Sequence, residues 1–148
     1  MELEKTIIPG CFEIQPKLLT DERGVFIKTF HTEVFRVFGL CISWKEMFYT
    51  TSKRGVLRGL HFQLPPHDHD KLVFCVSCSV QDVAVDLRIG SPTYGKSLQL
   101  TLSAQIGNMI FLPKGLAHGF CTPTEPAVLV YKLSSVYNQK ADAGIKWN

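Results

Sequence analysis

The 148-residue sequence lacks any long run of apolar residues and has little excess of charge of either sign. A membrane-spanning helix needs about 20 consecutive apolar residues, so the sequence predicts no span and no membrane partner. The 16 Lys and Arg residues outnumber the 13 Asp and Glu residues by too few to indicate nucleic-acid binding. The N-terminal residues include acids and do not resemble a secretory signal, which favours a cytoplasmic protein.

The sequence lacks the cysteine pattern of a disulfide framework or a redox motif. The five cysteines are an odd number, and only Cys75 and Cys78 have the spacing of a redox pair. The residues around them alternate as in a strand, which would place the two thiols on opposite faces. No helical pattern follows to lower a thiol pKa. We therefore expect buried structural cysteines.

The chain has no internal repeat, linker or low-complexity segment, and residues 1–148 are predicted to form a single domain. Short apolar or alternating segments recur between Gly, Pro, Asn and Asp residues, as is typical of β-strands. The clearest are 55–62, 72–76, 80–88, 97–102, 109–112 and 127–133. One short helix is predicted over residues 32–38. The pattern favours an antiparallel sandwich or open barrel, whose mouth commonly holds a small-molecule site.

The segment from Arg58 to Gln63 carries the first candidate site residues. Strand alternation places His61 and Gln63 on one face and Arg58 on the other, unless a β-bulge brings Arg58 and His61 together. A loop rich in proline follows. Lys71 then stands at the entrance of the next strand, where a cation can meet an anionic ligand.

A second group of candidates lies in the last third of the chain. His118 follows a turn and begins a predicted strand, in a pattern similar to the second sequence motif of cupins. Tyr131 on a late strand, and Tyr137 shortly after it, supply phenols that can donate a proton or stack on a ring.

Together and in this order, these residues resemble the dTDP-4-dehydrorhamnose 3,5-epimerase family, in matches that span nearly the whole chain. One such fragment would be a weak signal, whereas seven in register are specific. The fragments are DERGVF at 21–26, GVLRGLHFQ at 55–63, KLV at 71–73, DVAVDLR at 82–88, SPTYG at 91–95, the turn before His118, and GIKW at 144–147.

The resemblance implies a cupin-type antiparallel β-barrel or jelly roll with one or two short helices. It also implies an isomerase with no metal and no other cofactor, usually a homodimer, that acts on a nucleotide-linked 4-keto-6-deoxy sugar. Such enzymes serve deoxysugar and surface polysaccharide biosynthesis, and exchange protons beside the ketone at C3, C5 or both. A carbon acid of this kind is weak, so the reaction needs a base, an enolate-stabilising group and an acid across the ring.

By the same resemblance, His61 is the base, Lys71 stabilises the enolate and Tyr131 is the acid. The residue types suit these roles. An imidazole titrates near neutrality, whereas a phenol, with a pKa of about 10, stays protonated until it donates.

The resemblance also implies roles in substrate binding. Arg23 and Arg58 would hold the diphosphate, His118 would support the sugar or phosphate end, and Tyr137 would stack on the nucleotide base. The segment with Arg23 and Phe26 is expected to reach the neighbouring subunit's site. Other substrate-side positions are Lys28, Glu46, Phe48 and Gln63.

One departure from the family concerns the base. Many members carry an aspartate beyond the Gly-Ile-x-Trp motif that pairs with the base, and this sequence ends at Asn148, before that position. We expect Asp82, or failing it Asp86, to lie beside His61 and to orient its imidazole.

A second departure concerns the substrate side. Lys28, Glu46 and Phe48 stand where many members carry Glu, Gln and Asn. These changes leave open which nucleotide and which sugar the protein takes, and whether it epimerises one carbon or two.

Other functions remain as alternatives. A metal cupin could use His67, His69 and His118, but no Glu follows at cupin spacing and Lys71 would stand beside the metal, so no metal site is predicted. His67 and His69 are instead expected to be solvated. A 3,4-ketoisomerase of related fold would carry a histidine where this sequence has Gln63. A mono-epimerase and a non-catalytic sugar-nucleotide-binding cupin are the remaining alternatives.

Overall fold

A computed structural model describes residues 1–148 as an almost entirely β structure with one α-helix and one short 3-10 helix. In chain order the elements are β1 (Glu2–Lys5), β2 (Phe12–Gln15), β3 (Leu18–Asp21), β4 (Gly24–Ile27), α1 (Thr32–Val37), β5 (Glu46–Ser52), β6 (Leu57–Gln63), β7 (Lys71–Ser77), β8 (Ser79–Asp86), β9 (Ser97–Ser103), β10 (Met109–Leu112), β11 (Leu116–Cys121), β12 (Ala127–Leu133), η1 (Gln139–Ala141) and β13 (Asp142–Gly144).

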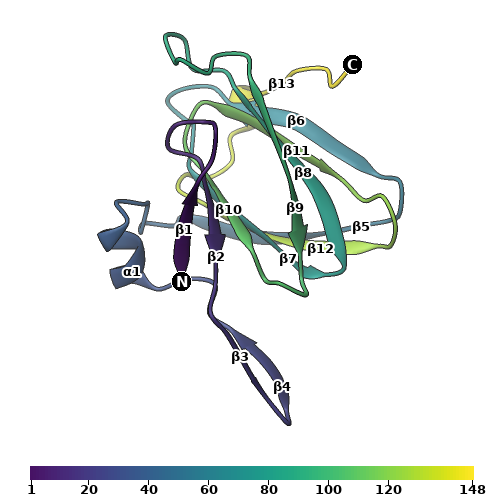
Figure 1. Ribbon diagram of the computed structural model, residues 1–148. Helices are drawn as coiled ribbons and strands as arrows, with labels where there is room; N and C mark the ends of the chain where they lie inside the picture. The colour runs from purple at the N-terminus through teal and green to yellow at the C-terminus, as the bar shows by residue number, and fades with distance from the viewer.

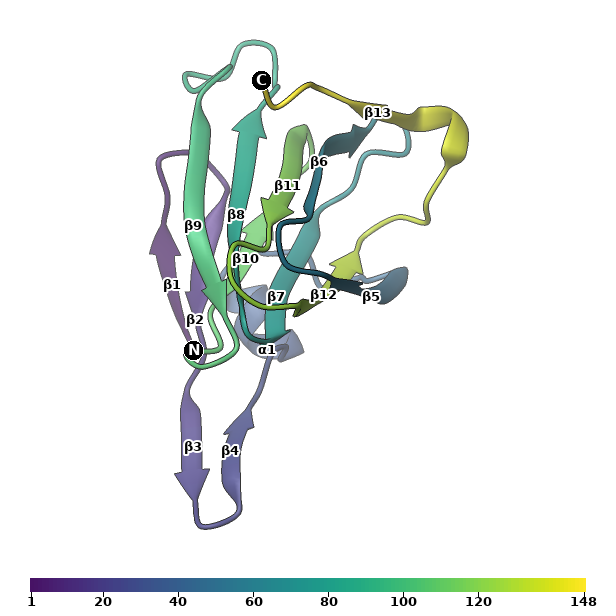
Figure 2. The same ribbon diagram turned by 90° about the vertical axis from the view of Figure 1, so that its right-hand side faces the viewer.

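Two antiparallel sheets pack against each other (Figures 1 and 2). The six-stranded sheet has the order β1-β2-β10-β7-β12-β5, and the five-stranded sheet has the order β13-β6-β11-β8-β9. Strands that are distant in sequence are therefore neighbours, as β10 and β2 are. The all-β antiparallel architecture expected from the sequence is confirmed, and so is the short helix.

The core between the sheets follows from strand alternation. Every second residue of β12 is buried, which places Leu129 and Tyr131 on the inner face of the six-stranded sheet. On β8 in the opposite sheet, Val80, Asp82 and Ala84 point inward in the same way. A pattern that builds an apolar core thus also directs two titratable side chains into it.

The outer face of the six-stranded sheet has its own apolar cluster. Leu72 and Phe74 on β7 pack there against Phe35 of α1 and against Leu40. Because β7 is covered on both faces, its first five residues are all buried. This explains why the segment reads as a continuous apolar run rather than an alternating one.

The β3–β4 hairpin extends away from the two sheets (Figures 1 and 2). It pairs only with itself, and its apolar side chains at Leu19, Val25 and Phe26 are more than half exposed. A two-stranded hairpin is marginally stable in water on its own. These three apolar side chains lack cover within their own chain.

The cysteine prediction is correct in part. All five thiols are free, and Cys11 and Cys75 are buried, but Cys78 is exposed. Cys78 lies between β7 and β8 with a φ of 62°, so the strand ends before it. The expectation that it continues the strand as a buried residue was wrong because a tight turn interrupts the alternation. No helix in the structure is long and apolar enough to cross a membrane.

Candidate active site

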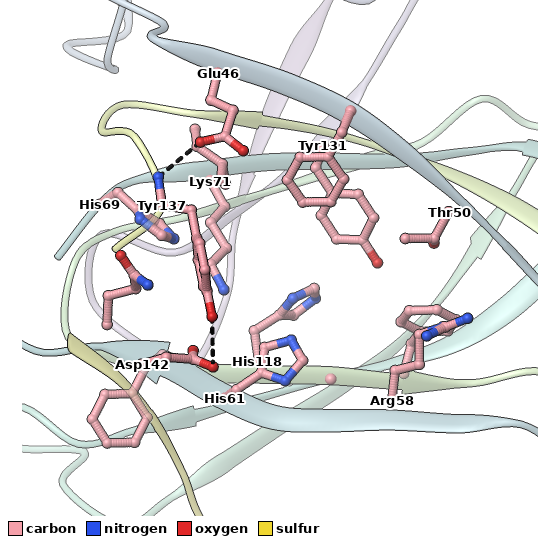
Figure 3. Close-up of a pocket in the computed structure, with 16 residues that line it drawn as sticks. Glu46, Thr50, Arg58, His61, His69, Lys71, His118, Tyr131, Tyr137 and Asp142 are labelled. Atoms are coloured by element: carbon pink, nitrogen blue, oxygen red, sulfur yellow. Dashed lines mark hydrogen bonds between the residues drawn. The ribbon is translucent and has the colours of Figure 1, made fainter. Parts of the chain in front are cut away.

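A pocket of about 470 Å³ opens between the two sheets (Figure 3). Its walls come from β5, β7 and β12 on one side and from β6 and β11 on the other, with His69, Tyr137 and Asp142 completing them. The structure brings together nine of the predicted site residues there: Glu46, Phe48, Arg58, His61, Gln63, Lys71, His118, Tyr131 and Tyr137.

A β-bulge on β6 places Arg58 and His61 in the same pocket. His61 pairs with His118 on β11 and Arg58 pairs with Phe120, so three residue steps on β6 oppose two on β11. The extra residue cancels the alternation that would separate the two side chains. The sequence left this convergence conditional on a bulge, and the structure contains one.

Two glycines permit the close approach of β6 and β11 at this bulge. A Cβ added to Gly59 would lie 2.6 Å from the Cα of Gly119, and one added to Gly119 would lie 2.5 Å from the carbonyl oxygen of Arg58. Gly59 also has a φ of 116°, which disfavours any other residue. Any side chain at either position would push the two strands apart.

His61 projects into the pocket from the five-stranded sheet and stays partly exposed. Burial lowers its pKa, and the nearby Lys71 and His118 lower it further. The imidazole is therefore neutral at pH 7 and can accept a proton. No hydrogen bond joins it to Asp82 or Asp86.

The prediction that Asp82 orients His61 was wrong. Asp82 is fully buried and accepts hydrogen bonds of 2.9 and 3.1 Å from Nε2 of His118. The strand order β6-β11-β8 explains this, because β11 lies between the strand of Asp82 and that of His61. His118 therefore meets the carboxylate first. Asp86 lies at the other end of β8, where it accepts hydrogen bonds of 2.9 and 2.8 Å from the guanidinium of Arg88.

Lys71 enters the pocket from the six-stranded sheet and is 8% exposed. Burial lowers its pKa to about 8, although Asp82 and Asp142 favour the charged form. No carboxylate makes a salt bridge with it. The ammonium is thus a poorly solvated cation that an anionic oxygen would stabilise.

Tyr131 faces His61 and His118 across the pocket (Figure 3). Burial raises the pKa of its phenol, so the hydroxyl is protonated over the whole physiological range. Phe48 stacks on its ring with centroids 4.8 Å apart, and the His118 ring meets it edge-on at 6.3 Å. These contacts hold the phenol in one orientation.

Residues 137 and 138 are fastened across one end of the pocket. The backbone N–H of Tyr137 donates to Glu46 at 2.8 Å, and its hydroxyl donates to Asp142 at 3.4 Å (Figure 3). Gln63 exchanges two 3.0 Å hydrogen bonds with the backbone of Asn138. Glu46 and Gln63 therefore position Tyr137, whose ring remains about half exposed.

Arg58 lies at the opposite end of the pocket from Tyr137 (Figure 3). Its Nε donates to the hydroxyl of Ser52 at 2.9 Å. This bond fixes the guanidinium and leaves its terminal nitrogens free for an anion.

Three predicted substrate residues do not line the pocket of their own chain. Arg23 is at the tip of the β3–β4 hairpin and pairs with Asp21, Phe26 is on β4, and Lys28 follows it. The hairpin extends away from the two sheets, so Arg23 and Phe26 of the 21–26 motif lie far from the pocket of their own chain.

The comparisons with known proteins settle the family. The sequence profile of the dTDP-4-dehydrorhamnose 3,5-epimerases matches residues 5–148. The chain belongs to this family. A dTDP-4-dehydrorhamnose 3,5-epimerase of Shigella flexneri is 42% identical over 149 residues, covering 100% of this chain and 82% of that protein.

Solved structures agree with this assignment. A dTDP-6-deoxy-D-glucose-3,5-epimerase of Legionella pneumophila Philadelphia 1, in complex with dTDP-4-keto-L-rhamnose, is 34% identical with a TM-score of 0.94. The match covers 99% of this chain and 78% of that one. A 3′-monoepimerase of Streptomyces bikiniensis, in complex with dTDP-quinovose, is 32% identical with a TM-score of 0.92, over 97% and 73% of the two chains. The cupin-type fold expected of this epimerase family is confirmed.

Sequence reasoning missed several pocket residues, of which His69, Thr50 and Asp142 are polar. His69 was expected to be solvated, which was wrong: it is 8% exposed, and burial lowers its pKa to about 4. It stands two residues before Lys71, a spacing that places both side chains on one face of an extended segment. That spacing was the available signal.

The two histidines before Lys71 contact other side chains of the protein. His69 Nδ1 is 3.1 Å from the hydroxyl of Ser135, and His67 Nε2 is 3.0 Å from the side-chain amide of Asn138. The structure contains no group of three His, Cys, Asp or Glu residues placed to hold a metal ion.

Proposed function

We propose that this chain epimerises a dTDP-linked 4-keto-6-deoxy hexose beside its ketone, as a step of deoxysugar biosynthesis. One observation carries the proposal: His61 and Tyr131 project into one pocket from facing sheets. A sugar ring between them would have a neutral base on one face and a protonated acid on the other. Inversion at carbon needs this arrangement, because the proton must leave one face and return to the other.

In the proposed step, His61 takes the proton from the carbon next to the ketone. The C–H electrons move to form an enolate, whose oxygen gains the negative charge. The Lys71 ammonium, which is itself poorly solvated, stabilises that oxygen. Tyr131 then gives its proton to the opposite face of the carbon, and the carbonyl re-forms. His118, fixed by Asp82, supports the sugar or phosphate end of the substrate.

The two ends of the pocket suit the rest of the substrate. The free nitrogens of Arg58 provide paired donors for a phosphate group. At the other end, the half-exposed ring of Tyr137 can stack on a flat nucleotide base. The substrate would then lie along the pocket with its sugar between His61 and Tyr131.

We further propose that the protein is a homodimer in which the β3–β4 hairpin crosses to the partner's pocket. The exposed apolar side chains of the hairpin support this arrangement, because an interface would bury them. Arg23 and Phe26 would then contribute to the partner's site, and Lys28 would stand at its edge. The five free thiols suit a reducing compartment, which supports a cytoplasmic location.

A mono-epimerase is the second candidate. A single acid must reach two carbons in a double epimerisation, and the stacking of Phe48 limits the positions that Tyr131 can adopt. The structural similarity to the Streptomyces bikiniensis 3′-monoepimerase also supports this candidate.

Incubation with the dTDP-linked 4-keto-6-deoxy hexose in deuterated water tests these proposals. Deuterium at C3 and C5 with inversion at both indicates a 3,5-epimerase, and deuterium at one carbon indicates a mono-epimerase. A 3-keto product would indicate a ketoisomerase. Tight binding without exchange would indicate a non-catalytic binding protein and would refute the proposal.

A further inference from the structure

The hydroxyl of Thr50 is a buried polar group that the mechanism leaves unused. Only two buried side-chain polar atoms in the protein have no hydrogen-bond partner: this hydroxyl and the indole nitrogen of Trp44. Trp44 packs against the outer apolar cluster, whereas Thr50 lines the pocket. Buried hydroxyls are nearly always paired, so an unpaired one in a ligand pocket calls for an explanation.

Strand register places Thr50 beside the proposed acid. On the β5–β12 pair, Phe48 lies directly opposite Tyr131, and Thr50 lies opposite Leu129. Thr50 and Phe48 share a face, so Thr50 is a diagonal neighbour of Tyr131. Figure 3 shows Thr50 at the hydroxyl end of the phenol. Phe48 stacks on the face of the phenol ring.

The electrostatics of the phenol agree with this placement. Burial raises the pKa of Tyr131, and Thr50 is close enough to oppose that rise. The two hydroxyls nevertheless do not meet hydrogen-bond geometry in this structure. The Thr50 donor is therefore available to the phenol oxygen without being committed to it.

Proton donation by Tyr131 would leave a negative charge on its oxygen, which the Thr50 hydroxyl can stabilise. When Tyr131 protonates the carbon of the enolate, its O–H bond breaks, a C–H bond forms and the O–H electron pair remains on the phenol oxygen. The resulting phenolate lies in a buried environment where an unpaired charge is unfavourable. A hydroxyl that donates to a charged oxygen makes a stronger bond than one that donates to a neutral oxygen. The interaction would thus strengthen as the proton leaves.

We propose that Thr50 is a positioning residue that donates a hydrogen bond to the Tyr131 oxygen as the phenol gives up its proton. Thr50 keeps its own proton throughout. After the product leaves, the His61 imidazolium gives its proton to water and the Tyr131 phenolate takes one from water, which returns both groups to their starting forms. The inference rests on the proposed epimerase function. It assigns Thr50 to the protonation half of the reaction and gives it no part in proton abstraction by His61.

The test compares Thr50→Val, which removes the hydroxyl but keeps the shape, with Thr50→Ser, which keeps the hydroxyl. Thr51→Val is the matched control, because Thr51 is the next residue of β5, is exposed and does not line the pocket. Each variant is incubated with the dTDP-linked 4-keto-6-deoxy hexose in deuterated water. Two quantities are measured separately. One is the amount of product with inverted configuration, and the other is the amount of sugar that has gained deuterium without inversion.

Thr50→Val should slow inversion roughly 10- to 100-fold, the effect of losing one hydrogen bond to a charged group. The ratio of non-inverting exchange to inversion should rise, because His61 still removes the proton. Thr50→Ser and Thr51→Val should stay near wild type. The melting temperature of Thr50→Val should not fall, since the substitution removes an unpaired buried polar atom.

A Tyr131→Phe background completes the test. If Thr50 acts through the phenol, adding Thr50→Val to Tyr131→Phe should change the residual exchange little. The inference would be overturned if Thr50→Val inverted its substrate at the wild-type rate, or if it lost exchange and inversion equally. Either result would leave the epimerase proposal intact. A wild-type protein that neither exchanges nor inverts would instead refute the epimerase proposal and, with it, this role for Thr50.

Discussion

The two pocket histidines, His61 and His118, lie opposite each other in one strand pair, yet their surroundings differ sharply. His118 is 2% exposed and is held by the buried carboxylate of Asp82. His61 is partly exposed, makes no hydrogen bond to another side chain and has a lowered pKa. The pairing of His118 suits a fixed support for substrate, and the freedom of His61 suits a group that gains and loses protons. The difference separates two residues of the same type into two roles.

The largest expected effect is on turnover and tests the role of His61. His61→Asn should lower kcat roughly 10²- to 10⁴-fold, the usual contribution of a general base. Because His61 is partly exposed and unpaired, the same substitution should leave the free energy of unfolding nearly unchanged. Steady-state kinetics and urea denaturation of one preparation measure both quantities. Normal turnover in this variant would remove His61 from the mechanism.

The pH dependence sharpens the contrast through Lys71. His61 must be neutral, and its pKa lies below the ordinary value of 6.5, so kcat should fall only below that pH. Lys71 must be charged, and its pKa of about 8 means that kcat should fall as the pH rises above 8. Each limb should approach roughly tenfold per pH unit.

Lys71→Arg provides the control for the alkaline limb. A guanidinium stays charged well beyond pH 10. The variant will be less active because its shape differs, but its residual kcat should not fall above pH 8. An alkaline limb that stays in place would assign it to another group.

The smallest expected effect is on stability and tests the His118 pair. Asp82→Ala leaves the Nε2–H of His118 buried without an acceptor, which should lower the free energy of unfolding by about 1–3 kcal/mol. His61→Asn, which changes the other histidine on β6 of the same sheet, should lower it by less than about 0.5 kcal/mol. Urea denaturation at pH 7 measures both. An equal loss of unfolding free energy in the two variants would contradict the proposed difference between the two histidines.

Local pattern predicted much of this protein. Alternation and turn residues located most strands of the two sheets, and the residues that resemble the family pointed to His61, Lys71, His118 and Tyr131, which the structure gathers in one pocket. Such features depend on neighbours in sequence or on motifs several residues long.

The errors come from features that depend on the arrangement of strands in space. The partner of Asp82 follows from β11 lying between β6 and β8, and no pattern within either strand reveals that order. The placement of Cys78 depends on a turn with positive φ between two apolar strands. Asp142 enters the pocket because β13 pairs with the edge of β6. A three-residue strand is too short for its sequence to predict that pairing.

The central claim is that His61 and Tyr131 act on opposite faces of one sugar carbon. Its most direct test follows deuterium and configuration at that carbon in His61→Asn and Tyr131→Phe in deuterated water. We expect His61→Asn to abolish both exchange and inversion, and Tyr131→Phe to lose inversion while it still exchanges with retained configuration. Exchange that survives in His61→Asn but is lost in Tyr131→Phe would contradict the assignment of base and acid.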